Sequence, residues 1–204
     1  MRRIVIFLNG TRGISILEKL KESIHDILTC IIPIEKEFDE VEKQIKKIGF
    51  RILRIHNVNH KTSIKILKKY NPKLFIIAGY STIFKKELMN LPEWGTVNLH
   101  AGPLPEYRGG SPLNWQIING EKKVSVSIIK VDEGIDTGEI LKEKDILINS
   151  DIDIGTLHDK VNKLFPKLVT ELLDSLEKNK NFKGRSQNNK KAVYWHQRND
   201  DDGY

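Results

Sequence analysis

Short apolar runs alternate with amphipathic stretches along the first hundred residues of the chain. Runs such as Ile4 to Leu8, Ile27 to Ile32 and Lys73 to Ala78 are continuously apolar, which is typical of parallel strands buried on both faces. Further strands are predicted at Phe50–Leu53 and Gly95–His100, and helices at Ile14–Leu20, Glu35–Lys47, Lys61–Tyr70 and Phe84–Leu91. This alternation predicts an α/β domain with a doubly wound, mostly parallel sheet.

The second half of the chain has a different pattern. Val124 to Val131 and Glu139 to Ile148 both read as strands, and their closeness in sequence predicts an antiparallel extension of the sheet. Asp151 to Lys178 is apolar at helical spacing, and Pro166 should kink this long helix. The predicted architecture is therefore Rossmann-like, with three layers.

The composition becomes polar from Asn179 onward. We therefore expect a domain over residues 1–179, followed by a polar tail over residues 180–204 that could begin a truncated accessory segment. The tail contains an apolar and aromatic patch, Ala192 to His196, which predicts that it docks on the rest of the protein.

Composition and charge narrow the function classes. In 204 residues there is no apolar run near the roughly 20 residues that span a bilayer, so no membrane partner is expected. The low cysteine count fits a reducing, cytosolic compartment, so we expect a cytoplasmic protein. The single Cys30 excludes an internal disulfide and a cysteine metal cage, and no metal site is expected. The net charge is +7, but acidic residues are interleaved with basic ones, so nucleic acid is an unlikely partner and a small polyanionic ligand fits better.

Candidate chemistry lies at the predicted strand ends, where open parallel sheets bind ligands. The turn Gly10-Thr11-Arg12-Gly13 follows the first strand but lacks the spacing of a dinucleotide site. It is either a tight strand-to-helix turn or an anion site at a helix N-terminus.

Asn98 and His100 stand two residues apart on a predicted strand, so their side chains project from the same face. An amide donor beside an imidazole can polarise a carbonyl group and move a proton. The alternative is a buried histidine with a purely structural role.

An acidic loop, Val131 to Gly138, separates the two later strands. A carboxylate of this loop could orient a histidine and set its protonation state. Asp132, Glu133 and Asp136 all qualify, and the alternative is a solvated turn.

Four motifs together resemble the 10-formyltetrahydrofolate-dependent formyltransferases: Asn98-Leu99-His100, Leu104-Pro105, Tyr107-Arg108-Gly109 and Asp136-Thr137-Gly138. The resemblance implies a Rossmann-like enzyme in which an amine attacks the formyl carbon of 10-formyltetrahydrofolate, and tetrahydrofolate leaves. It implies Asn98, His100 and Asp136 as the catalytic set. Asn98 would donate a hydrogen bond to the oxyanion of the tetrahedral intermediate. His100 would act as general base on the attacking amine, or would stabilise this oxyanion as an imidazolium. Asp136 would pair with His100 and help pass the proton to the leaving nitrogen.

The resemblance also implies binding segments. The donor would be bound, largely by backbone atoms, at Tyr80, Ser81, Thr82, Ile83 and Phe84, and at Val131, Asp132, Glu133, Gly134 and Ile135. The acceptor would be bound at Gly10, Thr11, Arg12, Tyr107, Arg108 and Gly109.

The acceptor is the least determined part of this hypothesis. The loop Leu104 to Leu113, the helix Asn114 to Glu121 and the tail Tyr194 to Gly203 are similar to nucleotide-linked amino-sugar N-formyltransferases, so a nucleotide sugar is the expected substrate. The alternatives are glycinamide ribonucleotide, methionyl-tRNA, and, from another class, a non-catalytic folate- or nucleotide-binding module. A homodimer stays open.

Overall fold

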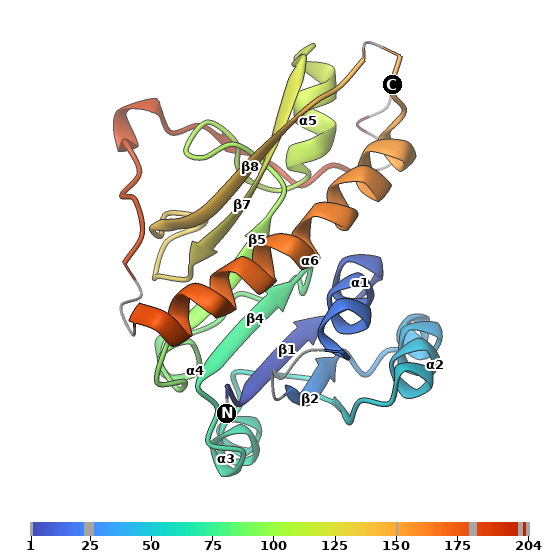
Figure 1. The fold of residues 1–204 in the computed structure, drawn as a ribbon, viewed down its shortest axis with the longest axis vertical. Helices are drawn as coiled ribbons and strands as arrows, with labels where there is room; N and C mark the ends of the chain where they lie inside the picture. Colours follow the sequence, from blue (N-terminus) through green and yellow to red (C-terminus); the bar gives the residue numbers. More distant parts are fainter. Residues whose placement is uncertain (1, 23–26, 150, 180–182, 200–201, 203–204) are drawn as a thin grey trace. The chain divides into compact units, whose positions relative to one another are not determined.

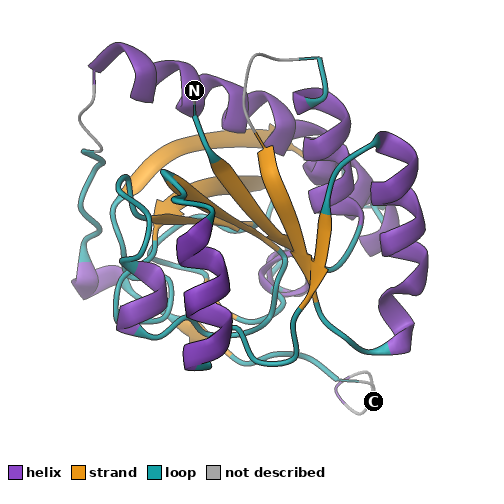
Figure 2. Cartoon of the chain, turned by 90° about the horizontal axis from the view of Figure 1, so that it is seen from below, coloured by secondary structure: helices purple, strands orange, loops and turns teal. Residues whose placement is uncertain are grey.

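The computed structural model describes residues 2–22, 27–149, 151–179, 183–199 and 202. The chain forms two compact units, Met1–Leu99 and His100–Tyr204. Helices and strands alternate along it (Figures 1 and 2). The boundary between the units falls inside one strand.

The first unit contains five parallel strands in the order β3-β2-β1-β4-β5. Their bounds are β1 Ile4–Leu8, β2 Ile27–Ile32, β3 Ile52–Arg54, β4 Leu74–Ala78 and β5 Thr96–His100. Every side chain of β1 and β4 is buried, as the continuous apolar runs predict. The α/β class and the mostly parallel sheet are therefore confirmed.

The helices of this unit are α1 (Thr11–Leu20), α2 (Asp39–Ile48), α3 (Lys61–Lys69) and α4 (Lys86–Met89), with a 3₁₀ turn η1 (Lys36–Phe38) before α2. The chain moves from β1 outward to β3, then crosses back to β4 and β5. Because such crossovers are right-handed, α1 and α2 cover one face of the sheet, and α3 and α4 cover the other. The direction in which successive strands are added to the sheet reverses between β1 and β4. Open α/β sheets bind ligands at such switch points.

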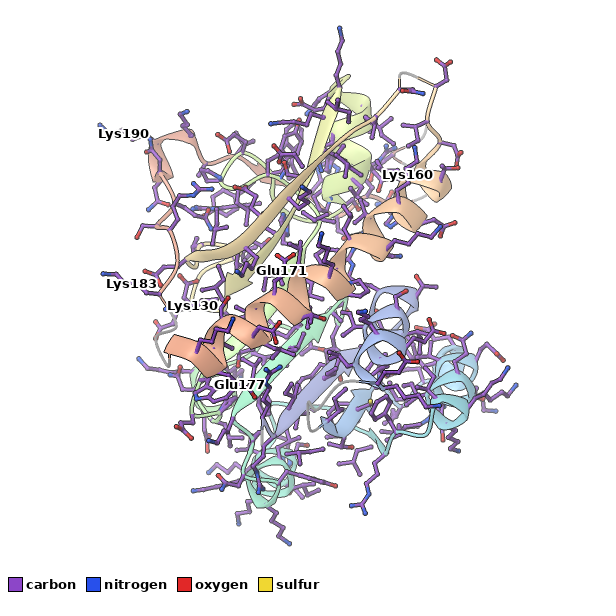
Figure 3. The ribbon with its side chains drawn as sticks, viewed as in Figure 1. Lys130, Lys160, Glu171, Glu177, Lys183 and Lys190 are labelled. Carbon is purple, nitrogen blue, oxygen red and sulfur yellow. The ribbon has the colours of Figure 1, made fainter. Side chains whose placement is uncertain are left out.

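The second unit contains an antiparallel pair, β7 (Lys123–Lys130) and β8 (Ile140–Leu147), as predicted. The long α6 (Ile154–Asn179) packs against both strands of this pair, and α5 (Pro112–Ile118) packs against α6. α6 continues through Pro166. Its buried apolar side chains include Leu157, Val161, Phe165, Leu168, Val169, Leu172, Leu173 and Leu176. Charged residues of both signs, such as Lys160, Glu171 and Glu177, occupy its exposed face (Figure 3).

The C-terminal residues dock within the second unit. β9 (Tyr194–Trp195) pairs in parallel with β6 (Arg108–Gly109), after a 3₁₀ turn η2 (Asn189–Lys191). The Trp195 ring stacks between Tyr107 and Trp115, with centroid separations of 5.6 and 4.8 Å. Docking of the aromatic patch is confirmed, whereas the domain boundary at residue 179 stays a prediction.

Several element ends differ from those predicted. α1 begins at Thr11 instead of Ile14, the helix predicted over Glu35–Lys47 is divided into η1 and α2, and α4 is shorter than Phe84–Leu91. The residues at which a helix begins and ends depend on local backbone hydrogen bonds, which the spacing of apolar residues does not reveal. Within the described residues, no helix is both long enough and apolar enough to cross a membrane.

Candidate functional site

His100 is buried at the end of β5, with 5% of its surface exposed. Its Nε2 lies 2.6 Å from the carbonyl oxygen of Tyr107, and its Nδ1 lies 3.5 Å from Oδ2 of Asp136. A carbonyl oxygen only accepts, so Nε2 carries a proton, and an ionised carboxylate also calls for a proton on Nδ1. Since a neutral imidazole has one N–H group, this geometry suits the imidazolium.

Asp136 is held in the loop between β7 and β8. Its backbone φ is +53°, in the left-handed region, which costs a non-glycine residue on the order of 1–3 kcal/mol. Its Oδ2 accepts the backbone N–H of Gly109 at 2.9 Å, and its side chain is 13% exposed. The backbone N–H of Gly109 therefore fixes the carboxylate oxygen of Asp136 that faces His100.

The structure distinguishes the three acidic residues of this loop. Asp132 accepts from the backbone N–H of Gly134 at 3.2 Å and from the Thr137 hydroxyl, so it stabilises the turn itself. Glu133 is exposed, and Asp136 lies within ion-pair distance of His100. The expected donor contacts of residues 131–135 stay predictions.

Arg108 is 2% exposed, and the C-terminal residues surround its guanidinium. It donates to Gln187 Oε1 at 2.8 and 3.1 Å, to Asn189 Oδ1 at 2.8 Å and to the Tyr194 hydroxyl at 2.8 Å. These bonds are internal, so the expected contact of Arg108 with substrate stays a prediction.

Tyr107 was also expected to bind the substrate, but its side chain contacts residues of its own unit. Its hydroxyl donates to Glu121 Oε1 at 2.7 Å and accepts from Asn119 at 3.0 Å. Burial, followed by the contact with Glu121, raises the pKa of Tyr107. Its carbonyl, rather than its ring, contacts His100. Substrate contacts of Tyr107 and Gly109 also stay predictions.

Sequence reasoning missed Gln116, whose side chain is fully buried. Its amide nitrogen donates to the carbonyls of Ala101 at 3.0 Å and Pro112 at 2.9 Å, and its oxygen accepts from the N–H of Ser125 at 3.3 Å. It thus fixes the segment just after His100 against α5 and β7. A single polar residue on a helix gives no sequence signal for such a role.

The other expected groups lie in the first unit. Asn98 stands on β5 opposite Ile77 of β4. Arg12 donates to the carbonyl of Leu99 at 2.9 Å, and burial lowers its pKa to about 10. Gly10 precedes α1 in extended conformation and Thr11 begins that helix. Contact of residues 10–12 with the acceptor stays a prediction.

The segment expected to bind the donor in the first unit, Tyr80 to Phe84, has two buried ends. Phe7 packs edge-on against the rings of Tyr80 at 5.8 Å and Phe84 at 4.7 Å. Burial raises the pKa of Tyr80 to about 12, with a smaller contribution from Glu35. The residues between these anchors are exposed: Ser81, Thr82 and Ile83.

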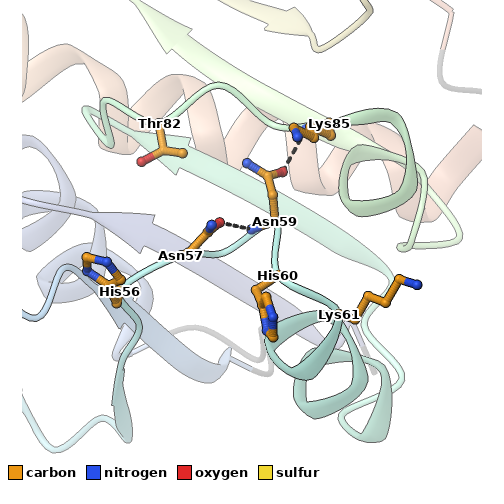
Figure 4. A pocket seen from close by; sticks show the side chains of 7 residues that line it. All are labelled: His56, Asn57, Asn59, His60, Lys61, Thr82 and Lys85. Carbon is orange, nitrogen blue, oxygen red and sulfur yellow. Dashed lines mark hydrogen bonds between the residues drawn. The ribbon is translucent and has the colours of Figure 1, made fainter.

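Asn59, which sequence reasoning also missed, braces the same segment. Its amide nitrogen donates to the carbonyl of Ile83 at 2.9 Å, and its oxygen accepts the N–H of Lys85 at 2.8 Å. An open pocket of about 620 Å³ adjoins these contacts (Figure 4). It is lined by His56, Asn57, Asn59, His60, Lys61, Thr82 and Lys85.

Comparison with known proteins agrees with this fold. The family model for formyl transferase matches residues 2–173. The methionyl-tRNA formyltransferase of Caldanaerobacter subterraneus subsp. tengcongensis is 34% identical over 187 residues, which cover 87% of this chain and 60% of that protein. The chain thus spans about half the length of the curated relatives it matches.

Two solved structures share the fold at low identity. Phosphoribosylglycinamide formyltransferase from Bacillus halodurans has a TM-score of 0.76 and 22% identity, covering 88% of this chain and 97% of that one. HypX from Aquifex aeolicus in complex with tetrahydrofolic acid has a TM-score of 0.73 and 17% identity, covering 97% of this chain and 30% of that one. Together with the family match over most of its length, these findings identify the chain as a member of the formyl transferase family.

Proposed function

We propose that this chain transfers the formyl group of 10-formyltetrahydrofolate to an amine. The observation that carries the proposal is the buried pair of His100 and Asp136, 3.5 Å apart in a chain of the formyl transferase family. HypX, which shares the fold, has been solved with tetrahydrofolic acid, and this supports a folate donor.

The reaction would proceed by addition and elimination. The acceptor nitrogen attacks the formyl carbon, a new C–N bond forms, and the carbonyl electron pair moves onto oxygen. Collapse of this oxyanion breaks the bond from carbon to N10 of the folate. The proton lost by the amine ends on N10, so the products are a formamide and tetrahydrofolate.

Each member of the catalytic set has a role that its chemistry supports. Asn98 donates a hydrogen bond to the oxyanion, a contribution of about 100- to 1,000-fold in rate. His100, which the geometry suits as an imidazolium, stabilises the same charge. Asp136 keeps His100 in this form and passes the amine proton to N10.

The donor would use the segments expected from the sequence, residues 80–84 and 131–135. Folate ends in glutamate carboxylates, and the pocket beside residues 80–84 is lined by Lys61, Lys85 and two histidines. Lys61 is the first residue of α3, whose N-terminus also favours negative charge. We therefore assign the carboxylate end of the donor to this pocket.

The acceptor is better supported as methionyl-tRNA than as the nucleotide-linked amino sugar that the motifs suggested. A curated relative whose match covers 87% of this chain is named for methionyl-tRNA, and a solved neighbour is named for phosphoribosylglycinamide. The expectation that nucleic acid is an unlikely partner is thereby weakened. The amino sugar, the cytoplasmic location and a homodimer stay predictions.

The test is tetrahydrofolate release from 10-formyltetrahydrofolate with four separate acceptors. These are initiator methionyl-tRNA, glycinamide ribonucleotide, and nucleotide-linked 3-amino and 4-amino sugars. Turnover with methionyl-tRNA alone supports the preferred acceptor, and turnover with another acceptor alone replaces it. Donor binding without turnover on any acceptor would favour the non-catalytic binding module.

Variants separate the catalytic set from general damage. Asn98→Ala, His100→Ala and Asp136→Asn should each cripple turnover while the protein stays folded. His158→Ala and Asp159→Asn, at exposed positions of α6, are the matched controls. Near-normal turnover of Asp136→Asn would remove Asp136 from the proposed proton path.

A further inference from the structure

Three consecutive residues support both members of the His100–Asp136 pair. The carbonyl of Tyr107 faces His100 Nε2 at 2.6 Å, and the N–H of Gly109 donates to Asp136 Oδ2 at 2.9 Å. Arg108 lies between these two contacts in the chain. Whatever fixes Arg108 therefore also fixes the backbone groups that hold the pair.

The C-terminal segment, residues 185–198, provides every hydrogen bond that the Arg108 guanidinium makes in the described part of the chain. The acceptors are oxygen atoms of Gln187, Asn189 and Tyr194. All three are neutral, and no carboxylate within the described ranges forms an ion pair with Arg108. A buried cation needs such acceptors, so the segment is required to keep Arg108 in place.

Gln187 has a second set of contacts that reaches Asp136 directly. Its amide nitrogen donates to the backbone carbonyls of Asp136 at 2.8 Å and Gly138 at 2.7 Å. The orientation of this amide is chemically fixed, because a guanidinium only donates and the two carbonyls only accept. One side chain thus joins Arg108 to the backbone of Asp136.

We propose that Gln187 is a positioning residue for formyl transfer, which holds Asp136 at its distance from His100. It does so from two sides: it anchors the carbonyl of Asp136, whose φ of +53° needs support, and it anchors Arg108 beside the Gly109 donor. This inference rests on the proposed function for its effect on turnover. The position of Asp136 relative to His100 can be tested in the protein without any substrate.

The experiment compares Gln187→Ala and Gln187→Glu with Asn188→Ala. The Asn188 side chain is the matched control, because within the described residues it accepts only the N–H of Lys190 in its own turn. The glutamate variant still offers Arg108 an acceptor but cannot donate to the carbonyls of Asp136 and Gly138. We expect both Gln187 variants to lower kcat about 10- to 100-fold, as partners that orient functional groups do, with an unchanged KM for 10-formyltetrahydrofolate. Asn188→Ala should match the unmodified protein.

A second readout keeps the inference separate from the proposed function. The ring ¹⁵N resonances of His100, assigned with a His100→Gln variant, should move in both Gln187 variants and stay in place in Asn188→Ala. If the unmodified protein shows no turnover, the proposed function fails, and the resonances still decide the positioning role. If Gln187→Ala fails to fold, Gln187→Glu decides alone. Normal kcat and unmoved resonances in a folded Gln187→Glu would overturn the proposal.

Discussion

The two units hold their candidate site residues by different physical means. In the first unit, the segment 80–84 is anchored by ring packing against Phe7, which lies in a strand with no exposed side chain. In the second unit, His100 donates to the carbonyl of Tyr107 and Asp136 accepts the N–H of Gly109, and these contacts in turn depend on Arg108 and Gln187. Apolar packing tolerates substitutions that conserve side-chain volume. A buried polar network is destabilised when one partner is lost, because the remaining groups are left without a hydrogen bond.

This difference predicts where substitutions act. Changes in the first unit should weaken folding or donor binding, and changes in the polar network should act on the chemical step.

His100→Ala should lower kcat by about 100- to 1,000-fold, because the imidazolium proposed to stabilise the oxyanion is lost. The variant should fold, since one buried ring is removed from a unit that has its own apolar core in α6. Tetrahydrofolate release measures the rate, and circular dichroism measures folding. A variant that is folded and fully active would place the chemistry elsewhere.

The difference between apolar packing and a polar network also decided how much of the structure could be predicted from the sequence. β1 and β2 were predicted with the bounds that the structure has, because a continuous apolar run marks a buried strand directly. The antiparallel pair and the docking of the aromatic patch were also predicted. These features leave local traces in the sequence.

The polar network left no such trace. Gln187 is nearly fifty positions from Gly138, and nothing in a polar tail distinguishes it from Asn188 beside it. Asn59 bonds across to Ile83 and Lys85 by the same kind of long-range pairing. The pairing of Asp136 with His100 came from the resemblance, because the residues alone left Asp132, Glu133 and Asp136 open.

Phe7→Ala should lower the free energy of unfolding by about 3–5 kcal/mol, as loss of a fully buried phenylalanine does. The ring contacts Phe75, Tyr80 and Phe84, with centroids 4.7 to 5.8 Å away. Urea unfolding followed by tryptophan fluorescence measures the loss. Phe7→Leu, which keeps much of the volume, is the control and should recover most of the stability.

Asn59→Ala should raise the Kd for 10-formyltetrahydrofolate by roughly 10-fold, because two hydrogen bonds that brace residues 83–85 are removed, each worth about 1 kcal/mol. Calorimetric titration with the donor gives the Kd, and kcat should be unchanged. Asn90→Ala, an exposed position after α4, serves as the control. A fall in kcat with an unchanged Kd would contradict the division between the two units.

The smallest effect concerns pH and Cys30, whose side chain is fully buried in β2. Burial raises the pKa of this thiol from 9.0 to about 12, so the folded protein keeps the proton that the unfolded chain releases above pH 9. Stability contributed by the thiol is therefore complete below pH 9 and is lost as the pH rises from 9 toward 12, by about 1 kcal/mol at pH 10. Cys30→Ala should flatten this part of the pH dependence, measured by urea unfolding at pH 8 and pH 10. Buried Tyr80 contributes in the same direction at higher pH, so the comparison belongs at pH 10. An equal loss of stability in both proteins would show that the thiol is already free to ionise in the folded state.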